Sequence, residues 1–255
     1  MIQEFKKRLK DGEVVFGPFM KTSDAAFVEI AGHAGFDFVI LDMEHAPFTY
    51  ANLQYLVMAA ELSGTLPIVR AQNSSDIFIS KALDIGALGV QVPHITNAAE
   101  AKSSISAAKF FPEGQRGMDP FVRASSYASV PSDQYFARAN ETLVILQLEG
   151  KEAIDHLDEI LDVDGIDILF IGPYDLSQSM GVPGQVNHPS VVGHMESIVN
   201  RAKERGIVVG TFTDTLESAR MWQDAGIQYI SYGVDVFLFK NACNSLLKQL
   251  HTPQK

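Results

Sequence analysis

Short apolar runs alternate with longer amphipathic segments along almost the whole chain. Several of the short runs have the length and side-chain composition of buried β-strands. They are Val14–Met20, Phe36–Met43, Pro67–Ala71, Gly89–Pro93, Leu143–Glu149, Ile166–Gly172, Ile207–Phe212 and Gln228–Tyr232. The run Leu143–Glu149 is apolar on both faces until its C-terminal end, which favours a parallel strand covered by helices.

Apolar residues at helical spacing fill the intervals between several of these runs. The clearest examples are Ala51–Leu62, Ile77–Leu83, Ala98–Phe110 and Val191–Arg205. Eight strands that alternate with helices predict an α/β fold, a closed (β/α)8 TIM barrel. An open doubly wound sheet is the alternative, but no G-x-G-x-x-G motif follows the first strand, as its dinucleotide-binding version requires.

One connection breaks the regular alternation. The stretch between Phe111 and Glu141, after the fourth predicted strand, is long and rich in Gly, Pro, Ser and Tyr. A connection of that length inside a compact domain is usually a functional lid or an oligomer contact, and the sequence does not decide between the two. Nothing resembles a linker or a repeat, so residues 1–255 are predicted to form a single barrel domain.

Composition narrows the classes of partner. The net charge of −11 disfavours nucleic acids and anionic membranes as partners, and favours a soluble protein. No apolar run approaches the roughly 20 residues that a membrane-spanning helix needs. The only cysteine is Cys243, so no intrachain disulfide can form, which favours a cytoplasmic setting. The first residues, MIQEFKKRLKDG, predict a short amphipathic helix.

Polar side chains gather at the C-terminal ends of the predicted strands, where (β/α)8 barrels carry their catalytic groups. These side chains are Asp42, Glu44, His45, Arg70, His94, Gln147, Glu149 and Asp175. Glu149 and Asp175 follow neighbouring strands and have few cationic residues near them in the sequence. The pair therefore predicts a divalent cation held by oxygen ligands, with helix capping or ion pairing as the alternative.

The second and third strand ends suggest acid–base chemistry. His45 is a candidate general base, because a neutral imidazole can accept a proton near pH 7. Asp42 could orient that imidazole if the strand ends near Glu44. Arg70 suits an anionic substrate group, with a structural salt bridge to Asp42 or Glu44 as the alternative. His94 is interpreted as a loop histidine without a catalytic role.

The positions of the lysines argue against covalent catalysis. A Schiff-base aldolase needs a lysine on an inner strand, with a pKa lowered by burial. None of the predicted strands has an internal lysine, and Lys21 lies just beyond the first. A metal-assisted route is therefore the stronger hypothesis.

Six motifs, in this order, resemble the HpcH/HpaI family of metal-dependent, pyruvate-forming aldolases. They are LDMEHAP (41–47), PIVR (67–70), LDIGALGVQVP (83–93), FPEGQRG (111–117), QLEGKEAIDHLDEI (147–160) and DGIDILFIGPYDLSQSMG (164–181). The resemblance runs nearly from end to end. Members of the family cleave 4-hydroxy-2-oxo acids, including 2-keto-3-deoxy sugar acids and 4-hydroxy-2-oxoheptanedioate, into pyruvate and an aldehyde.

The resemblance implies a role for each matching residue. Glu149 and Asp175 would be the protein ligands of Mg²⁺ or Mn²⁺, with Co²⁺ as a further option. His45 would be the catalytic base, and Arg70 would hold the keto or enolate oxygen. Substrate contacts would involve Arg70, Gln147, Gly172, Pro173, Tyr174 and Asp175. Family members are commonly hexamers, so Asp84 could act in the site of a neighbouring subunit.

Two departures from the family pattern concern specificity. Tyr174 stands where members usually have a small residue, so a phenol lies beside the expected ligand Asp175. The segment 71–75 after Arg70 also differs from the proline- and tryptophan-containing version typical of the family. The aldehyde product is therefore open.

Three other functions compete with the aldolase. A citrate-lyase-β-like acyl-CoA lyase would need a basic surface for the CoA phosphates, and no clear Lys/Arg cluster follows the strands. A non-catalytic barrel that binds a 2-oxo acid or a metal would need neither His45 nor Arg70. A phosphosugar isomerase would need a glycine-rich phosphate site where this chain has GTFTD and SYGVD.

Overall fold

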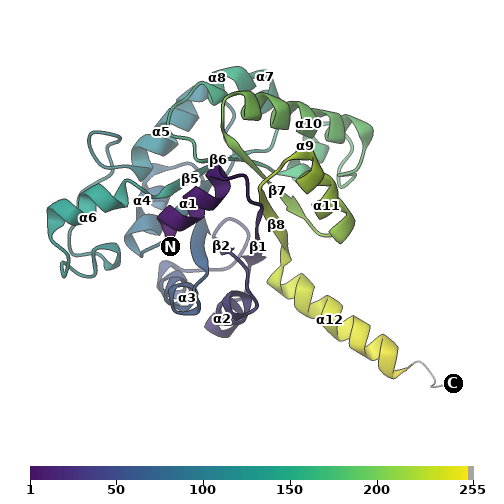
Figure 1. The fold of residues 1–255 in the computed structure, drawn as a ribbon, viewed down its shortest axis with the longest axis horizontal. Helices are drawn as coiled ribbons and strands as arrows, with labels where there is room; N and C mark the ends of the chain where they lie inside the picture. The colour runs from purple at the N-terminus through teal and green to yellow at the C-terminus, as the bar shows by residue number, and fades with distance from the viewer. Residues whose placement is uncertain (252–255) are drawn as a thin grey trace.

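The computed structural model describes residues 1–251 and shows a closed barrel of eight parallel strands (Figure 1). The strands are β1 (Val15–Met20), β2 (Phe38–Asp42), β3 (Leu66–Arg70), β4 (Gly89–Val92), β5 (Leu143–Leu148), β6 (Ile168–Ile171), β7 (Val208–Thr213) and β8 (Tyr229–Val234). Each pairs with the next along the chain, and β8 pairs with β1 to close the barrel. Every strand end lies within two residues of its prediction, so the TIM-barrel prediction is confirmed.

The helices surround the barrel (Figure 1). They are α1 (Ile2–Lys10), α2 (Ala25–His33), α3 (Tyr50–Ser63), α4 (Asp76–Asp84), α5 (Ala98–Ala108), α6 (Ser132–Ala139), α7 (Lys151–Asp155), α8 (Leu157–Leu161), α9 (Pro173–Ser179), α10 (Pro189–Glu204), α11 (Leu216–Ala225) and α12 (Asp235–Leu250). A capping box between Thr49 and Asn52 starts α3 and satisfies amide groups of its first turn. The helices predicted from periodicity are confirmed as α3, α4, α5 and α10, and the N-terminal helix as α1.

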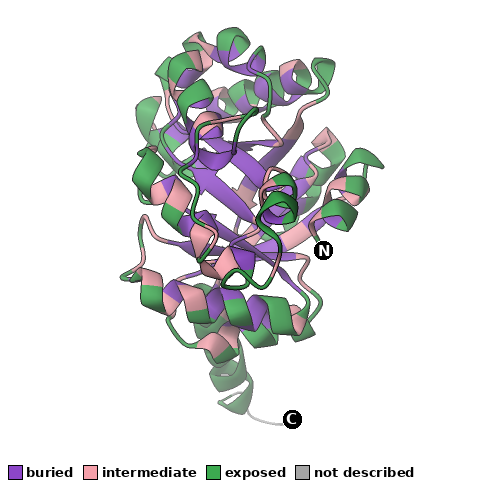
Figure 2. Cartoon of the chain, turned by 90° about the vertical axis from the view of Figure 1, so that its left-hand side faces the viewer, coloured by how far each residue is buried: buried purple, intermediate pink, exposed green. Residues whose placement is uncertain are grey.

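Large aromatic side chains fill the interior of the barrel at the N-terminal ends of its strands. Phe38 and Tyr229 stack with their ring centroids 4.0 Å apart, and Phe5 of α1 packs edge-on against both. A Cβ atom on Gly210 would lie 2.7 Å from the Tyr229 ring, so the absence of a side chain there makes room for the tyrosine. Burial concentrates on the strands, whereas the outer faces of the helices are exposed (Figure 2). The aromatic cluster of Phe5, Phe38 and Tyr229, which we call the aromatic plug, closes the N-terminal end of the barrel. Polar side chains of the strands therefore gather at the opposite, C-terminal end.

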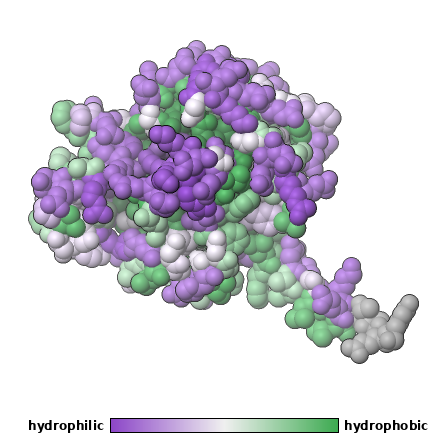
Figure 3. Space-filling view, in the orientation of Figure 1, coloured by the Kyte–Doolittle hydropathy of each residue, from purple (hydrophilic) through white to green (hydrophobic). Residues whose placement is uncertain are grey.

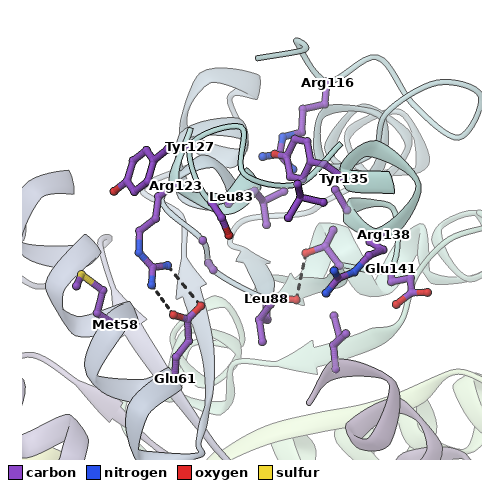
Figure 4. Close-up of a pocket in the computed structure, with 18 residues that line it drawn as sticks. Met58, Glu61, Leu83, Leu88, Arg116, Arg123, Tyr127, Tyr135, Arg138 and Glu141 are labelled. Atoms are coloured by element: carbon purple, nitrogen blue, oxygen red, sulfur yellow. Dashed lines mark hydrogen bonds and ion pairs between the residues drawn. The ribbon is translucent and has the colours of Figure 1, made fainter. Parts of the chain in front are cut away.

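The long segment after β4 lies away from that polar end. Arg116 pairs with Asp84 at the end of α4, and Arg123 pairs with Glu61 near the end of α3. Together with residues just before β4 and β5, the segment encloses a cavity of about 540 Å³ near the N-terminal ends of those strands (Figure 4). The lid alternative is therefore wrong for the chain's own barrel, because Arg116 and Arg123 hold the segment at the opposite end from the predicted site.

The last helix projects away from the barrel (Figure 1). Of the described side chains in α12, Asp235 alone is buried, and it anchors the start of the helix by accepting hydrogen bonds from Lys21 and Thr22 beyond β1. Hydrophobic side chains are visible on the projecting part (Figure 3). Within residues 1–251, no helix combines the length and hydrophobicity needed to cross a membrane.

Candidate active site

The polar residues predicted at the strand ends come together because the strands are parallel and in register. Asp42 of β2 pairs directly with Arg70 of β3. Leu148 of β5 pairs with Ile171 of β6, so Glu149 and Gly172 leave the barrel side by side. The C-terminal ends of β2 to β6 thus form one polar site opposite the aromatic plug.

Asp42 is fully buried and holds the guanidinium group of Arg70. Its two carboxylate oxygens accept hydrogen bonds from Arg70 Nε at 2.9 Å and Nη2 at 2.8 Å, and Lys21 Nζ lies 3.1 Å away. Burial acts to raise the pKa of Asp42, but the two cations outweigh it, so the pKa lies below its ordinary value. Asp42 Oδ1 also accepts the backbone N–H groups of Glu44 and His45. The expectation that Asp42 orients the His45 imidazole is therefore not met, since its oxygens contact Arg70, Lys21 and the turn.

Arg70 has further contacts that fix the plane of its side chain. Its Nη1 lies 3.0 Å from Glu44 Oε2, and its guanidinium carbon lies 4.6 Å from the centre of the Phe19 ring. The alternative of a salt bridge to Asp42 or Glu44 is confirmed in both forms. A guanidinium held on several sides keeps one orientation, which suits the recognition of a planar anionic group.

His94 joins the site between two carboxylates. Its Nε2 lies 2.7 Å from Glu44 Oε1, and its Nδ1 lies 2.5 Å from Glu149 Oε2. The backbone of His94 is in the left-handed region with φ at 59°, an uncommon conformation for a residue other than glycine. His94 lies in the loop after β4, as predicted, but its contacts with Glu44 and Glu149 bring it into the site. Its place directly after the fourth strand was the available signal.

The Glu149 carboxyl is the most perturbed acid of the site. Burial, together with the nearby charges of Glu44 and Asp175, raises its pKa to about 7, although His94 and Gln147 act in the opposite direction. Its Oε2 has the close contact with His94 Nδ1 and accepts no hydrogen bond from the other described residues. A buried carboxylate beside other acids requires a compensating cation to be stable in its charged form.

A chain of amides positions the other oxygen of Glu149. The Gln91 side chain donates to Gln147 Oε1, and the Gln147 amide donates to Glu149 Oε1. Both glutamines are buried. Gln147 therefore orients Glu149 in addition to its predicted contact with substrate.

Gly172 brings Asp175 to the same place. A Cβ atom on Gly172 would lie 3.3 Å from Glu149 Cγ, 3.6 Å from Asp175 Oδ2 and 3.7 Å from Gln147 Nε2. The three side chains therefore surround a residue that has no side chain of its own. Pro173 follows as the first residue of α9, and Asp175 lies in the first turn of that helix.

Two donor sets at this site suit a metal ion. Glu44, His94 and Glu149 each present a ligand atom, and these atoms lie within 4.8 Å of one another. Glu149 and Asp175, the pair predicted from sequence, flank Gly172. The buried Glu149 Oε2, whose contact among the described residues is with His94 alone, fits a divalent cation with oxygen ligands. The pKa of Glu149, raised by burial and by the charges of Glu44 and Asp175, fits the same ion.

The remaining predicted residues lie in different places. The His45 imidazole is largely exposed at the mouth of the site, with Nε2 3.8 Å from Glu44 Oε2. Tyr174 also lies at the mouth, and its hydroxyl donates to Asp214 Oδ2 at 2.7 Å. Asp84 is the last residue of α4 and pairs with Arg116 at 2.5 Å, far from the chain's own site.

Comparisons with known proteins show which proteins the chain is similar to in sequence and fold. The family model described as HpcH/HpaI aldolase/citrate lyase matches residues 16–242. A 2-keto-3-deoxy-L-rhamnonate aldolase of Escherichia coli (strain K12) is 36% identical over 245 residues, which are 95% of this chain and 91% of that protein. A crystal structure of an HpcH/HpaI aldolase/citrate lyase family protein from Burkholderia cenocepacia J2315 has a TM-score of 0.93 and 29% identity, covering 98% of this chain and 99% of that chain. The citrate synthase SbnG has a TM-score of 0.86 and 30% identity, covering 96% of each chain.

Proposed function

The chain belongs to the HpcH/HpaI aldolase/citrate lyase family, and we propose that it is a divalent-metal-dependent aldolase acting on a 4-hydroxy-2-oxo acid. As a carbon–carbon lyase, it would release pyruvate and an aldehyde. The observation that carries this proposal is that two groups lie at the same end of the barrel. One is the buried Glu149 carboxyl, whose raised pKa a bound cation would offset, and the other is the Arg70 guanidinium, which Asp42 holds in a fixed orientation. A related 2-keto-3-deoxy-L-rhamnonate aldolase supports a sugar-acid substrate.

Glu149 and Asp175 would hold the metal ion, Mg²⁺ or Mn²⁺, with Co²⁺ as a further option. When bound, such an ion supplies Lewis-acid stabilisation of negative charge on a substrate oxygen. Glu44 and His94 are further donors beside Glu149.

Arg70 would stabilise the negative charge that the cleavage creates, and His45 would accept the proton that it releases. Breaking the C3–C4 bond leaves an electron pair that delocalises onto the keto oxygen, and the Arg70 guanidinium donates hydrogen bonds to that oxygen. The C4 hydroxyl must lose a proton, directly or through water, and His45 accepts it at the mouth of the site. Gln147, Gly172, Pro173 and Tyr174 would line the substrate.

Pyruvate release tests this function directly. Purified protein would be given 2-keto-3-deoxy sugar acids and 4-hydroxy-2-oxoheptanedioate with Mg²⁺ or Mn²⁺, then with a chelator, and then with metal restored. We expect pyruvate with metal, loss with chelator and recovery on restoration, measured with a coupled lactate dehydrogenase assay. If the rate of cleavage is unchanged by the chelator, the assignment of a metal-dependent reaction is contradicted. No cleavage by a protein that still binds metal and oxalate would favour the acyl-CoA lyase or the binding protein.

The projecting helix α12 supports a homo-oligomer, with a hexamer as the expected state. Phe239, Leu246 and Leu250 recur at helical spacing on one face of α12 and are 60%, 57% and 70% exposed. An apolar stripe of this kind costs free energy in water, and a second copy of the chain would cover it. We expect Leu246→Glu to shift the molar mass measured by light scattering towards the monomer. Asn241→Glu, on the opposite face, is the matched control, and an unchanged mass for Leu246→Glu would contradict the role of α12.

Two further parts of the proposal concern organisation and compartment. We place one domain over residues 1–255, of which 252–255 lie outside the described residues. All strands of the described part share one barrel, which supports this. We also place the protein in the cytoplasm, where an exposed free thiol such as Cys243 stays reduced.

A further inference from the structure

A row of three aromatic rings leads from Arg70 to the rim of the site. The Phe19 ring of β1 lies under the Arg70 guanidinium, and the Phe212 ring of β7 follows with a centroid distance of 5.9 Å. Tyr174 of α9 comes next, with its ring centroid 6.0 Å from that of Phe212. The row ends at Asp214, which accepts the Tyr174 hydroxyl at 2.7 Å. We call Phe19, Phe212 and Tyr174 the aromatic row.

The two ends of the aromatic row differ in chemistry. At the inner end, Arg70 is the group that would hold the keto oxygen in the proposed reaction. At the outer end, Tyr174 and Asp214 present polar oxygens at the mouth, where Tyr174 is 43% exposed and Asp214 is half-buried. A substrate whose keto end lay at Arg70 would have its carbons beyond C4 along the row. Those carbons become the aldehyde product.

Hydrogen bonding at the outer end suits substrate hydroxyl groups. The Tyr174 phenol donates its one hydroxyl proton to Asp214 Oδ2. The phenol oxygen and the other carboxylate oxygen of Asp214 retain lone pairs that can accept. A hydroxyl group on the substrate can donate to either oxygen.

Charge at the outer end disfavours a second substrate carboxylate. Among the ion pairs of residues 1–251, none involves Asp214, and the cations nearest the inner end, Lys21 and Arg70, are both engaged with Asp42. An anionic tail would therefore meet the uncompensated carboxylate of Asp214. The two carboxylates would repel each other, and the partial burial of Asp214 reduces the screening of that repulsion by water.

From this arrangement we propose that Tyr174 and Asp214 form the outer wall of the aldehyde subsite and select uncharged, hydroxylated aldehydes over aldehydes that carry a carboxylate. The inference rests on the proposed aldolase function and specifies its substrate class. The hydrogen bond between positions 174 and 214 joins α9 to the connection that follows β7, so it spans the gap between two neighbouring barrel units.

The synthetic direction tests the inference. Pyruvate would be combined separately with glyceraldehyde, which is neutral and hydroxylated, and with succinic semialdehyde, which carries a carboxylate. The measured quantity is the ratio of the two kcat/KM values, because a ratio cancels differences in the amount of folded enzyme. We expect the wild type to favour glyceraldehyde at least about tenfold, since removing or adding one charge contact has effects of this order.

Two variants probe the wall separately. Asp214→Asn keeps the shape and removes the charge, so we expect the ratio to shift about tenfold towards succinic semialdehyde. Tyr174→Phe removes the hydroxyl and keeps the ring, so we expect a higher KM for glyceraldehyde with little change for propanal, which has no hydroxyl to bind. Asp224→Asn, an exposed acid on α11, is the matched control and should leave the ratio unchanged.

Deuterium exchange separates failure of this inference from failure of the proposed function. The methyl protons of pyruvate exchange in D₂O when the enolate forms, and no aldehyde is needed. If the wild type catalyses neither exchange nor cleavage, the aldolase function itself fails. If exchange occurs but the wild type prefers succinic semialdehyde, or if both variants keep the wild-type ratio, the function stands and the proposed wall is overturned.

Discussion

Glu149→Gln is expected to lower kcat/KM for pyruvate release by about 10³-fold, equivalent to about 4 kcal/mol of transition-state stabilisation. Glutamine keeps the volume of the side chain but removes the charge that would bind the metal. The same change should weaken metal binding by about 100-fold or more, measured by calorimetric titration with Mn²⁺. Because Glu149 is buried between Gln147 and His94, the neutral side chain should not unfold the protein.

Glu152→Gln is the matched control for this variant. Glu152 lies three positions further along the chain, in the exposed first turn of α7. Glu152→Gln therefore removes the same charge close in the sequence but on the exposed surface. We expect near wild-type activity and metal affinity for the control. If Glu149→Gln kept more than about a tenth of the activity, Glu149 could not be an essential metal ligand.

The pH dependence of metal binding gives Glu149 a second, independent readout. Its pKa is raised from 4.5 to about 7, so below that pH the carboxyl carries a proton that the metal must displace. We therefore expect the metal affinity of the wild type to fall about tenfold for each pH unit below 7 and to level off above it. In Glu149→Gln this slope should disappear.

The metal-free protein should respond to pH in the opposite sense. A carboxyl whose pKa is higher in the folded state than in the unfolded state favours folding while it is protonated. That contribution to the free energy of unfolding is lost as the pH rises from 4.5 to about 7. Bound metal offsets the loss, because it binds the ionised carboxylate of the folded protein.

Sequence was sufficient for the strands and for most of the site because both follow from local patterns. Parallel strands place their C-terminal ends at one edge, so Arg70 and Glu149 could be assigned to the same site before any contact was known. Asp42 was also found, but its salt bridge with Arg70 was predicted only as the alternative to a substrate contact. The alternation of strand side chains does not say which neighbouring strand supplies the cation, and this depends on the register between β2 and β3.

His94 was missed for a different reason. Its side chain reaches Glu44 and Glu149 only because its backbone adopts a left-handed conformation, and nothing in the neighbouring sequence requires that conformation. The partnership of Tyr174 with Asp214 was equally hidden, since the residues are 40 positions apart and belong to different barrel units. Contacts between such units depend on packing, which single-sequence periodicity does not encode.

The positions of two outer elements also needed the fold. The long segment after β4 has the composition of a lid, yet the pairing of its Arg116 and Arg123 with α4 and α3 places it at the other end of the barrel. The sequence of α12 shows the periodicity of an amphipathic helix, but a hydrophobic stripe predicts only that something covers it. Whether the cover is the chain's own barrel or another copy depends on tertiary geometry.

Arg70→Lys is the variant that separates catalysis from architecture at this site. Lysine keeps the positive charge but cannot form the two parallel hydrogen bonds to Asp42, the contact with Glu44 and the stacking on Phe19 at once. We expect kcat to fall about 100-fold, because the group that stabilises the developing enolate oxygen is displaced. Exchange of the pyruvate methyl protons should fall by a similar factor, since it passes through the same enolate.

The same variant should lower stability while sparing the metal site. Asp42 is completely buried, and losing one of its charged hydrogen bonds should cost about 1–3 kcal/mol in the free energy of unfolding, measured by urea denaturation. Arg205→Lys is the matched control, because Arg205 forms comparable contacts with Asp158 and Asp162 on the exposed surface and should change neither measurement. A loss of stability with unchanged kcat and exchange would leave Arg70 as only a structural partner of Asp42. If kcat falls by more than the loss of folded protein explains, Arg70 must also act on the substrate.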